Sequence, residues 1–155
     1  MIPLMDELNA LREAIDAGDG DAINEIYDTP DGVGIGLENV PIDLLNQLLA
    51  MPGHRFHQLV ARELQKTGDN STVPYVRTVL DRGFDFLAYT GSEDAVIAKW
   101  LSYVLSDIGT PDAVAALREY AQSPNAQVAE AMSYRLRQRA TPEAISSRLR
   151  RRATD

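Results

Sequence analysis

The sequence predicts an all-α protein built from repeated helix–turn–helix units. The stretch GTPDAVAALREY at 109–120 is nearly repeated 31 residues later as ATPEAISSRLRR at 140–151. Apolar residues follow each repeat start at offsets of about five, eight and twelve, which is one face of a helix. The segments before the repeat starts also have helical spacing, and none alternates as a strand does. Together these patterns indicate stacked helix pairs.

Four residues mark the repeat starts, and each is expected to end the helix before it. They are Gly18, Gly68, Gly109 and Ala140. Glycine readily adopts the left-handed conformation that follows the last residue of many helices. After the last two starts, Thr and Pro suit the N-cap and the first helical position. The spacings of 50, 41 and 31 residues make the repeats most regular toward the C-terminal end.

Each helix is predicted from its own apolar stripe, taken in chain order. The longer spacings are explained by an added helix at 41–51 and an extra loop at 83–92. The helices are expected at 4–17, 20–28, 41–51, 54–67, 72–82, 93–108, 111–122, 125–139 and 142–151. Their stripes supply the predicted core: Leu8, Leu11, Ile23, Ile26, Leu45, Leu48, Leu59, Leu64, Val76, Leu80, Trp100, Leu101, Leu105, Val114, Leu117, Val128 and Leu136.

The composition fits one globular domain over 1–155, with regular repeats at 54–152 and a divergent part at 1–53. The absence of cysteine excludes disulfides, thiolate metal sites and cysteine nucleophiles. No signal peptide or membrane span is expected, so a cytoplasmic location is the default. The net charge of −8 is uneven: residues 1–50 carry −10, and residues 135–155 carry +5. The acidic part is expected to repel nucleic acid and anionic lipid.

The repeated motif resembles a known family. Gly-Thr-Pro-Asp-Ala-Val-x-x-Leu at 109–117, with the following Ser-Pro-Asn-Ala-Gln-Val and Leu136, is similar to HEAT-like repeats of the phycobilisome-lyase type. The match is best over 93–152, fair over 54–83 and weak before residue 40. The resemblance implies a right-handed α-solenoid with a concave binding face. Such folds serve adaptors, chromophore lyases, a class of DNA glycosylases and bacterial immunity proteins, so the fold alone does not specify a function.

Few residues suggest chemistry. His54 and His57 have a metal-compatible spacing, but further ligands are lacking, and capping or solvent-facing roles are expected instead. DGVGIG at 31–36 lacks the Lys of a phosphate loop, and DAGDGD at 16–21 lacks the ligand spacing of a calcium loop. Trp100 is expected in the core, with a stacking platform as the alternative. No catalytic constellation, metal or cofactor is predicted.

The helices after the repeat starts have a second face that core packing does not explain. Residues at offsets of three, seven and ten from each repeat start point away from the apolar stripe, and those at six and thirteen lie nearby. The resemblance places this acidic face on the concave surface of the solenoid. The predicted partner-binding residues are Asp21, Asn24, Asp28, Asp31, Thr78, Asp81, Asp112, Glu119 and Gln122. The Arg-rich end, 135–155, is interpreted as a terminal cap, with nucleic-acid contact as the alternative.

These features predict a non-catalytic protein-binding solenoid that recruits or neutralises a basic protein. A bacterial immunity protein that covers the basic cleft of a cognate toxin fits the small size and the acidic face. An assembly adaptor or regulatory scaffold is the alternative. A chromophore-lyase-like enzyme comes third, because it would need an aromatic and cationic pocket, whereas Tyr75, Arg77 and Tyr103 are scattered. A DNA glycosylase would need a basic face.

Overall fold

The computed structural model describes residues 4–27 and 36–140, and within them the chain is all-α, with no β-strand. The α-helices are α1 (Leu4–Asp16), α2 (Gly20–Tyr27), α3 (Ile42–Ala50), α4 (His57–Thr67), α5 (Val73–Arg82), α6 (Asp94–Ile108), α7 (Pro111–Tyr120) and α8 (Ala126–Arg139). Three short 3-10 helices, η1 (Leu37–Asn39), η2 (Asn70–Thr72) and η3 (Asp85–Thr90), lie in the connections. The all-α prediction is confirmed. Each predicted helix before residue 140 is present, and its observed first and last residues lie within three residues of the predicted ones. The helix expected at 142–151 lies outside the described residues.

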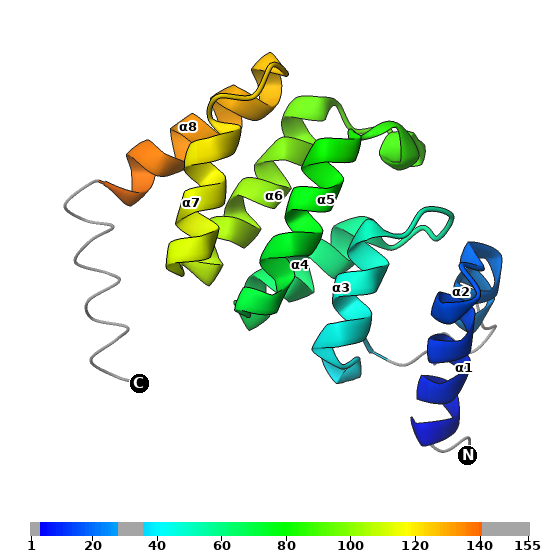
Figure 1. The fold of residues 1–155 in the computed structure, drawn as a ribbon. Helices are drawn as coiled ribbons and strands as arrows, with labels where there is room; N and C mark the ends of the chain where they lie inside the picture. Colours follow the sequence, from blue (N-terminus) through cyan, green and yellow to red (C-terminus); the bar gives the residue numbers. More distant parts are fainter. Residues whose placement is uncertain (1–3, 28–35, 141–155) are drawn as a thin grey trace.

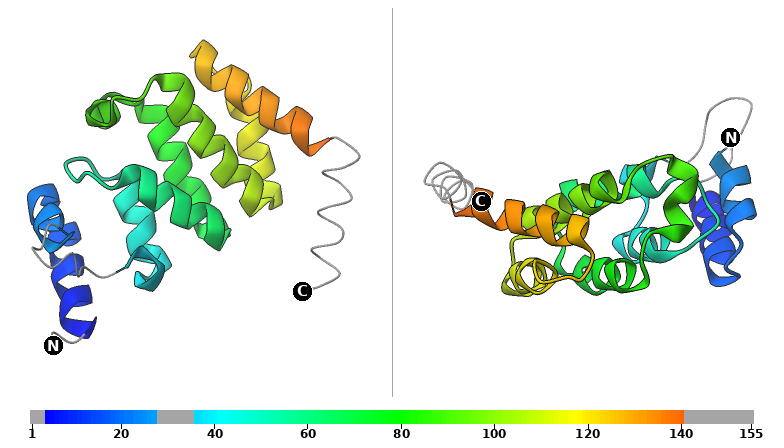
Figure 2. Two further views of the ribbon diagram at one scale, coloured as in Figure 1. Left: turned by 180° about the vertical axis from the view of Figure 1, so that it is seen from behind. Right: turned by 90° about the horizontal axis from the view of Figure 1, so that it is seen from above.

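Six of the helices form two layers (Figure 1). Helices α3, α5 and α7 are neighbours in one layer, and α4, α6 and α8 are neighbours in the other, which Figure 2 shows from behind. Helix α6 is central, since it packs on α4 and α8 in its own layer and on α5 and α7 in the other. The α1–α2 hairpin lies at the α3 end of this stack, and α8 lies at the opposite end.

The predicted helix boundaries have the expected local causes. Gly18, Gly68 and Gly109 have φ values of +66°, +62° and +66°, so all three adopt the left-handed conformation after a helix. Thr110 accepts a hydrogen bond from the Ala113 amide at 3.2 Å and thereby caps α7. The fourth repeat start, Ala140, follows α8 in a right-handed conformation instead, because a Cβ atom makes the left-handed one costly.

The core runs through both layers and into the hairpin. Most predicted core residues are buried or packed against it, but Val114 is only partly buried and lies outside this core, and the prediction for Leu59 is wrong, because half of this residue is exposed. Helix α4 instead turns His57, Val60 and Leu64 inward. Residue 59 lies about 100° around the helix from residue 60, so both cannot face the same neighbours.

Candidate functional site

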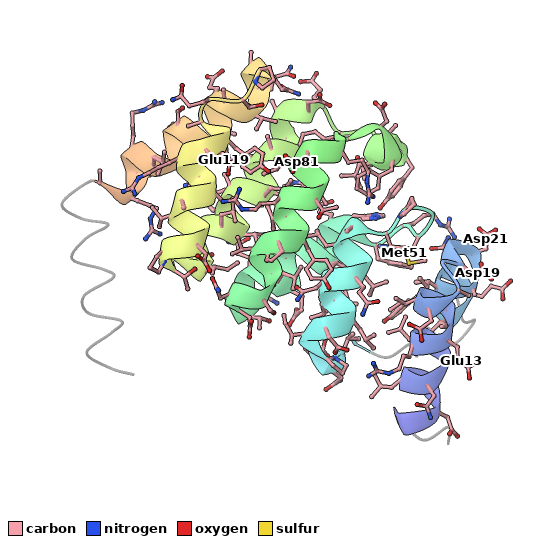
Figure 3. All side chains as sticks on the ribbon, in the orientation of Figure 1. Glu13, Asp19, Asp21, Met51, Asp81 and Glu119 are labelled. Carbon is pink, nitrogen blue, oxygen red and sulfur yellow. The ribbon has the colours of Figure 1, made fainter. Side chains whose placement is uncertain are left out.

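The structure separates the predicted partner-binding residues into two groups. Asp21 is exposed on α2, in the α1–α2 hairpin. Thr78 and Asp81 are exposed on α5, Asp112 and Glu119 are exposed on α7, and Gln122 is exposed just beyond α7; these five residues belong to the α3–α5–α7 layer. Figure 3 shows Asp21 far from Asp81 and Glu119. Asp28 and Asp31 lie outside the described residues.

Asn24 has a structural position instead of a surface one. Only 9% of the residue is exposed. Its side-chain amide donates to the Gly53 carbonyl at 3.3 Å, and its side-chain oxygen accepts from the Arg55 amide at 3.0 Å. Asn24 therefore attaches α2 to the loop between α3 and α4. A partner could reach Asn24 only by displacing these two hydrogen bonds.

The acidic residues of α5 and α7 are engaged within the chain. Glu119 forms an ion pair with Arg77, and Asp112 accepts a hydrogen bond from Asn70 at 3.0 Å. Asp81 accepts a hydrogen bond of 2.6 Å from the Tyr120 hydroxyl. Burial, together with this contact, raises the pKa of Tyr120 to about 12. The partner of Glu119 is a cation, whereas the partners of Asp81 and Asp112 are neutral groups that fix their positions.

The α1–α2 hairpin carries the densest negative charge. Seven carboxylates and one arginine lie between residues 4 and 27, and that arginine, Arg12, already pairs with Asp43 of α3 at 3.3 Å. A shallow depression of about 470 Å³ lies between the two helices. It is lined by Ala10, Glu13, Ala14, Ala17, Asp19, Ala22, Glu25 and Ile26. The small alanines leave room for a side chain, and the carboxylates around them favour a cation.

Sequence reasoning missed Glu13 and Glu25 as members of this group. The predicted surface includes only residues of the helices that follow the repeat starts. Helix α1 precedes the first repeat start, so the repeat pattern does not show that α1 and α2 form one surface. The charge of −10 over residues 1–50 was the available signal. Asp19 has a second role, because its carboxylate accepts from the Ala22 amide at 3.0 Å and caps α2.

His54 and His57 are buried in the loop between α3 and α4 and at the start of α4. Both are about 1% exposed, so the expectation of solvent-facing side chains is wrong. Their rings stack with centroids 3.8 Å apart. Each Nε2 atom lies 2.6 Å from a carbonyl oxygen, of Leu48 and of Met51 respectively. A carbonyl only accepts, so both Nε2 atoms must carry the proton.

These contacts cap the C-terminal end of α3, where carbonyls lack partners within the helix. The remaining ring nitrogens act as acceptors: Nδ1 of His54 accepts from the Phe56 amide at 3.1 Å, and Nδ1 of His57 lies 2.6 Å from the Tyr89 hydroxyl. Desolvation lowers the pKa of both rings, to about 3 for His57, where the neighbouring His54 adds to the effect. The pair is thus neutral and structural. Among residues 4–27 and 36–140, no group of three or more His, Asp or Glu side chains could hold a metal ion.

A different surface lies on the outer side of the α4–α6–α8 layer. One depression of about 340 Å³ between α4 and α6 includes Ala61, Val96 and Trp100 in its lining. A second, of about 350 Å³, lies between α6 and α8. Lys99 and Tyr103 line both, so the two depressions adjoin at α6. Trp100 is partly buried: it packs against the core and also lines the first depression.

Arg135 gives this surface its cationic character. Its guanidinium lies 3.7 Å from the centroid of the Tyr103 ring and 5.5 Å from that of Tyr134. Sequence reasoning treated Tyr103 as isolated and assigned Arg135 to a cap, yet the two meet where α8 packs on α6. Arg139 does act at a helix end, because it donates to the Ser106 carbonyl of α6 at 2.6 Å.

Comparisons with protein-family models, with curated proteins and with solved structures found no match to this chain. In the part of the chain described, no helix is both long enough and apolar enough to cross a bilayer. The surfaces themselves are therefore the basis for a functional argument. They are an acidic hairpin at one end of the stack and an aromatic, cationic surface on the α4–α6–α8 layer.

Proposed function

We propose that this chain is a non-catalytic protein-binding α-solenoid, a right-handed stack of HEAT-like helix pairs, that binds a basic protein partner. The two layers support the proposal, because solenoids stack helix pairs so that each pair contacts its neighbours. The outer face of each layer is not used for packing of the core, so it can contact another protein. Solenoids use such extended faces to bind other macromolecules.

The charge of the α1–α2 hairpin is the observation that carries the proposal. Asp21 is exposed, and Glu13 and Glu25 are exposed and line a depression of about 470 Å³. A lysine or arginine side chain of a partner could enter between them. The surrounding carboxylates would attract that partner from a distance, since summed charge accelerates association. The same charge opposes binding to nucleic acid or to an anionic membrane.

A bacterial toxin whose active cleft is basic is a partner that fits this chemistry. A nuclease, for example, holds phosphates with Lys and Arg, and an acidic protein can cover that cleft. The chain would then act as the cognate immunity protein in the cytoplasm. The steering charge would make capture of the toxin fast, which is what neutralisation of a toxin requires.

An assembly adaptor is the second candidate, and the α4–α6–α8 surface favours it. An adaptor must hold two partners at once, and this surface differs from the hairpin in both charge and position. A partner at the hairpin would leave Lys99 and Tyr103 uncovered. A toxin neutraliser needs only the acidic surface.

The experiment begins with affinity purification from the native host and identification of the partner by mass spectrometry. Association rates are then measured for the wild type and for a triple variant, Glu13→Lys, Asp21→Lys and Glu25→Lys. Asp19 is left unchanged because it caps α2. We expect the triple variant to associate at least about 10-fold more slowly, because attraction becomes repulsion. Raising salt from 0.05 to 0.5 M should also slow the wild type, since the Debye length falls from roughly 14 to roughly 4 Å.

A matched double variant, Asp81→Lys and Asp112→Lys, tests whether the partner instead binds the acidic residues of α5 and α7. If it slows association and the hairpin variant does not, the partner binds on α5 and α7. If neither variant changes the rate and salt has no effect, attraction of a basic partner is contradicted.

A further inference from the structure

We infer that the two depressions on either side of α6 form a second binding site, which takes an acidic peptide segment of a partner protein. The segment would place a carboxylate side chain against Arg135 and a neighbouring large apolar side chain between α4 and α6. This inference does not depend on the proposed role of the hairpin, because it uses other helices and the opposite charge.

The position of Arg135 is the main evidence for an anionic group. The residue is 8% exposed and lines the depression between α6 and α8. Its Nε atom lies 3.5 Å from the Ser102 hydroxyl, which is a weak contact. Within residues 4–27 and 36–140, no carboxylate forms an ion pair with it. Arg135 is thus a largely buried arginine that pairs with no carboxylate in the described part of the chain.

The rings of Tyr103 and Tyr134 hold this guanidinium in place. With the ring of Tyr103 only 3.7 Å away, the guanidinium of Arg135 has little freedom to rotate. A planar guanidinium can donate two parallel hydrogen bonds to one carboxylate. Because the group is already ordered, little conformational entropy is lost when a carboxylate binds. The arrangement therefore suits a carboxylate better than a mobile surface lysine would.

The depression between α4 and α6 would hold the apolar side chain of the ligand. Ala61, Val96 and Trp100 line it, and Val96 is 42% exposed. Arg62 and Lys99 line the same depression. Since Lys99 and Tyr103 also line the second depression, one extended or helical segment can reach both. The apolar side chain and the carboxylate would therefore lie close together in the sequence of the ligand.

The lining of the two depressions has more cationic than acidic side chains, which favours an acidic ligand. The rest of the lining is mostly apolar, which favours a peptide over a nucleic acid. Arg62, Lys99 and Arg135 line the two depressions, and Glu130 is the one carboxylate that does. Nucleic-acid binding depends on neutralising several phosphates in a row, which this mostly apolar lining does not provide. A nucleic acid would also meet the charge of −10 carried by residues 1–50. A short acidic peptide can avoid most of that charge.

The test starts from a random 12-residue peptide library displayed on phage and selected on the immobilised full chain. We expect enrichment of Asp or Glu within four residues of Leu, Ile, Phe or Trp. One selected peptide is then synthesised with its acidic residue and with the corresponding amide. Binding of both to the wild type is measured by fluorescence anisotropy. The amide should bind at least about 10-fold more weakly, as expected for loss of a charge-assisted hydrogen bond.

Three variants assign this difference to the site. Arg135→Lys keeps the charge but removes the planar fork, so most of the difference between acid and amide should disappear. Lys99→Gln, on the exposed part of α6, should weaken the acidic peptide several-fold without changing the melting temperature. Arg118→Gln, exposed on α7, is the matched control and should change nothing. If Arg135→Lys fails to fold, Lys99→Gln still decides the question.

Several results would overturn the inference. They are a selection that yields no peptide, selected peptides without acidic residues, or an acid–amide difference that persists in Arg135→Lys. Unchanged binding in Lys99→Gln would also overturn it. So would Arg135-dependent binding of a twelve-nucleotide oligo-dT or of phosphatidylserine vesicles when no acidic peptide binds.

Discussion

The α1–α2 hairpin and the α4–α6–α8 surface differ in how their charges are held. The hairpin carboxylates are numerous and exposed, so their attraction is summed and acts over a distance. The α4–α6–α8 surface has few charges, and one of them, Arg135, is held against two tyrosines. Its attraction acts at contact distance, where geometry matters. The first arrangement favours fast association, and the second favours selection among ligands.

The largest expected effect concerns the packing behind these two surfaces. Leu101→Ala in α6 should lower the free energy of unfolding by about 2–5 kcal/mol, because it leaves a cavity in the core. Leu11→Ala in α1 should cost less, near the lower end of that range. Both side chains are at most 2% exposed, but α6 packs on four helices and α1 mainly on α2 and α3. Urea denaturation measures both values. A larger loss for Leu11→Ala would show that the hairpin, not α6, is central to stability.

A second effect concerns the histidines that lie between the two surfaces. The pKa of His57 is about 3 in the folded chain and about 6.5 in the unfolded one. The unfolded chain therefore binds the extra proton first, so stability is full above pH 6.5 and falls as the pH drops toward 3. From pH 7 to pH 5 we expect His57 to contribute a loss of about 2 kcal/mol.

Urea denaturation of the wild type and of His57→Gln at both pH values measures this contribution. The variant should lose less stability on acidification, although it starts from a lower value at pH 7. An identical pH dependence in the two proteins would show that His57 is protonated as easily when folded as when unfolded. Measurements stop at pH 5 so that carboxylates contribute little.

A smaller effect concerns the attachment of the hairpin. Asn24→Ala should cost about 1–3 kcal/mol, because the Gly53 carbonyl and the Arg55 amide lose their partner in a largely buried place. Asp21→Ala, three residues away and exposed, should cost less than about 0.5 kcal/mol. Thermal and urea unfolding of both variants give the comparison. Equal losses would mean that Asn24 does not hold the hairpin in solution.

The fold could be predicted because its signals are local. Gly68 and Gly109 end helices, and Thr110 with Pro111 starts one, through contacts within a few residues. The apolar stripes are equally local, since three to four residues separate their members. The error at Leu59 arose because a stripe does not specify which of two adjacent apolar positions faces a neighbouring helix.

The surfaces were harder to predict because they depend on which helices are neighbours. Tyr103 and Arg135 are 32 residues apart, and only the packing of α8 on α6 brings their side chains together. Asn24 is polar and lies at an outward offset, yet the loop of Gly53 covers it. Neither contact follows from periodicity, whereas the charge of the hairpin was visible as a surplus of carboxylates over residues 1–50.

The side-chain contacts at the start of α4 have a consequence for the exchange of backbone hydrogens with solvent. Amides in loops and at helix starts usually exchange quickly, because they lack acceptors within the helix. Here three consecutive amides, of Arg55, Phe56 and His57, donate to Asn24, His54 and Tyr89 respectively. The acceptor of the Phe56 amide lies in the loop itself, whereas the acceptors of the Arg55 and His57 amides come from α2 and η3, which are distant in the chain. The Arg55 and His57 hydrogens should therefore exchange only when the segments separate, so these two amides should report on the integrity of the surrounding structure.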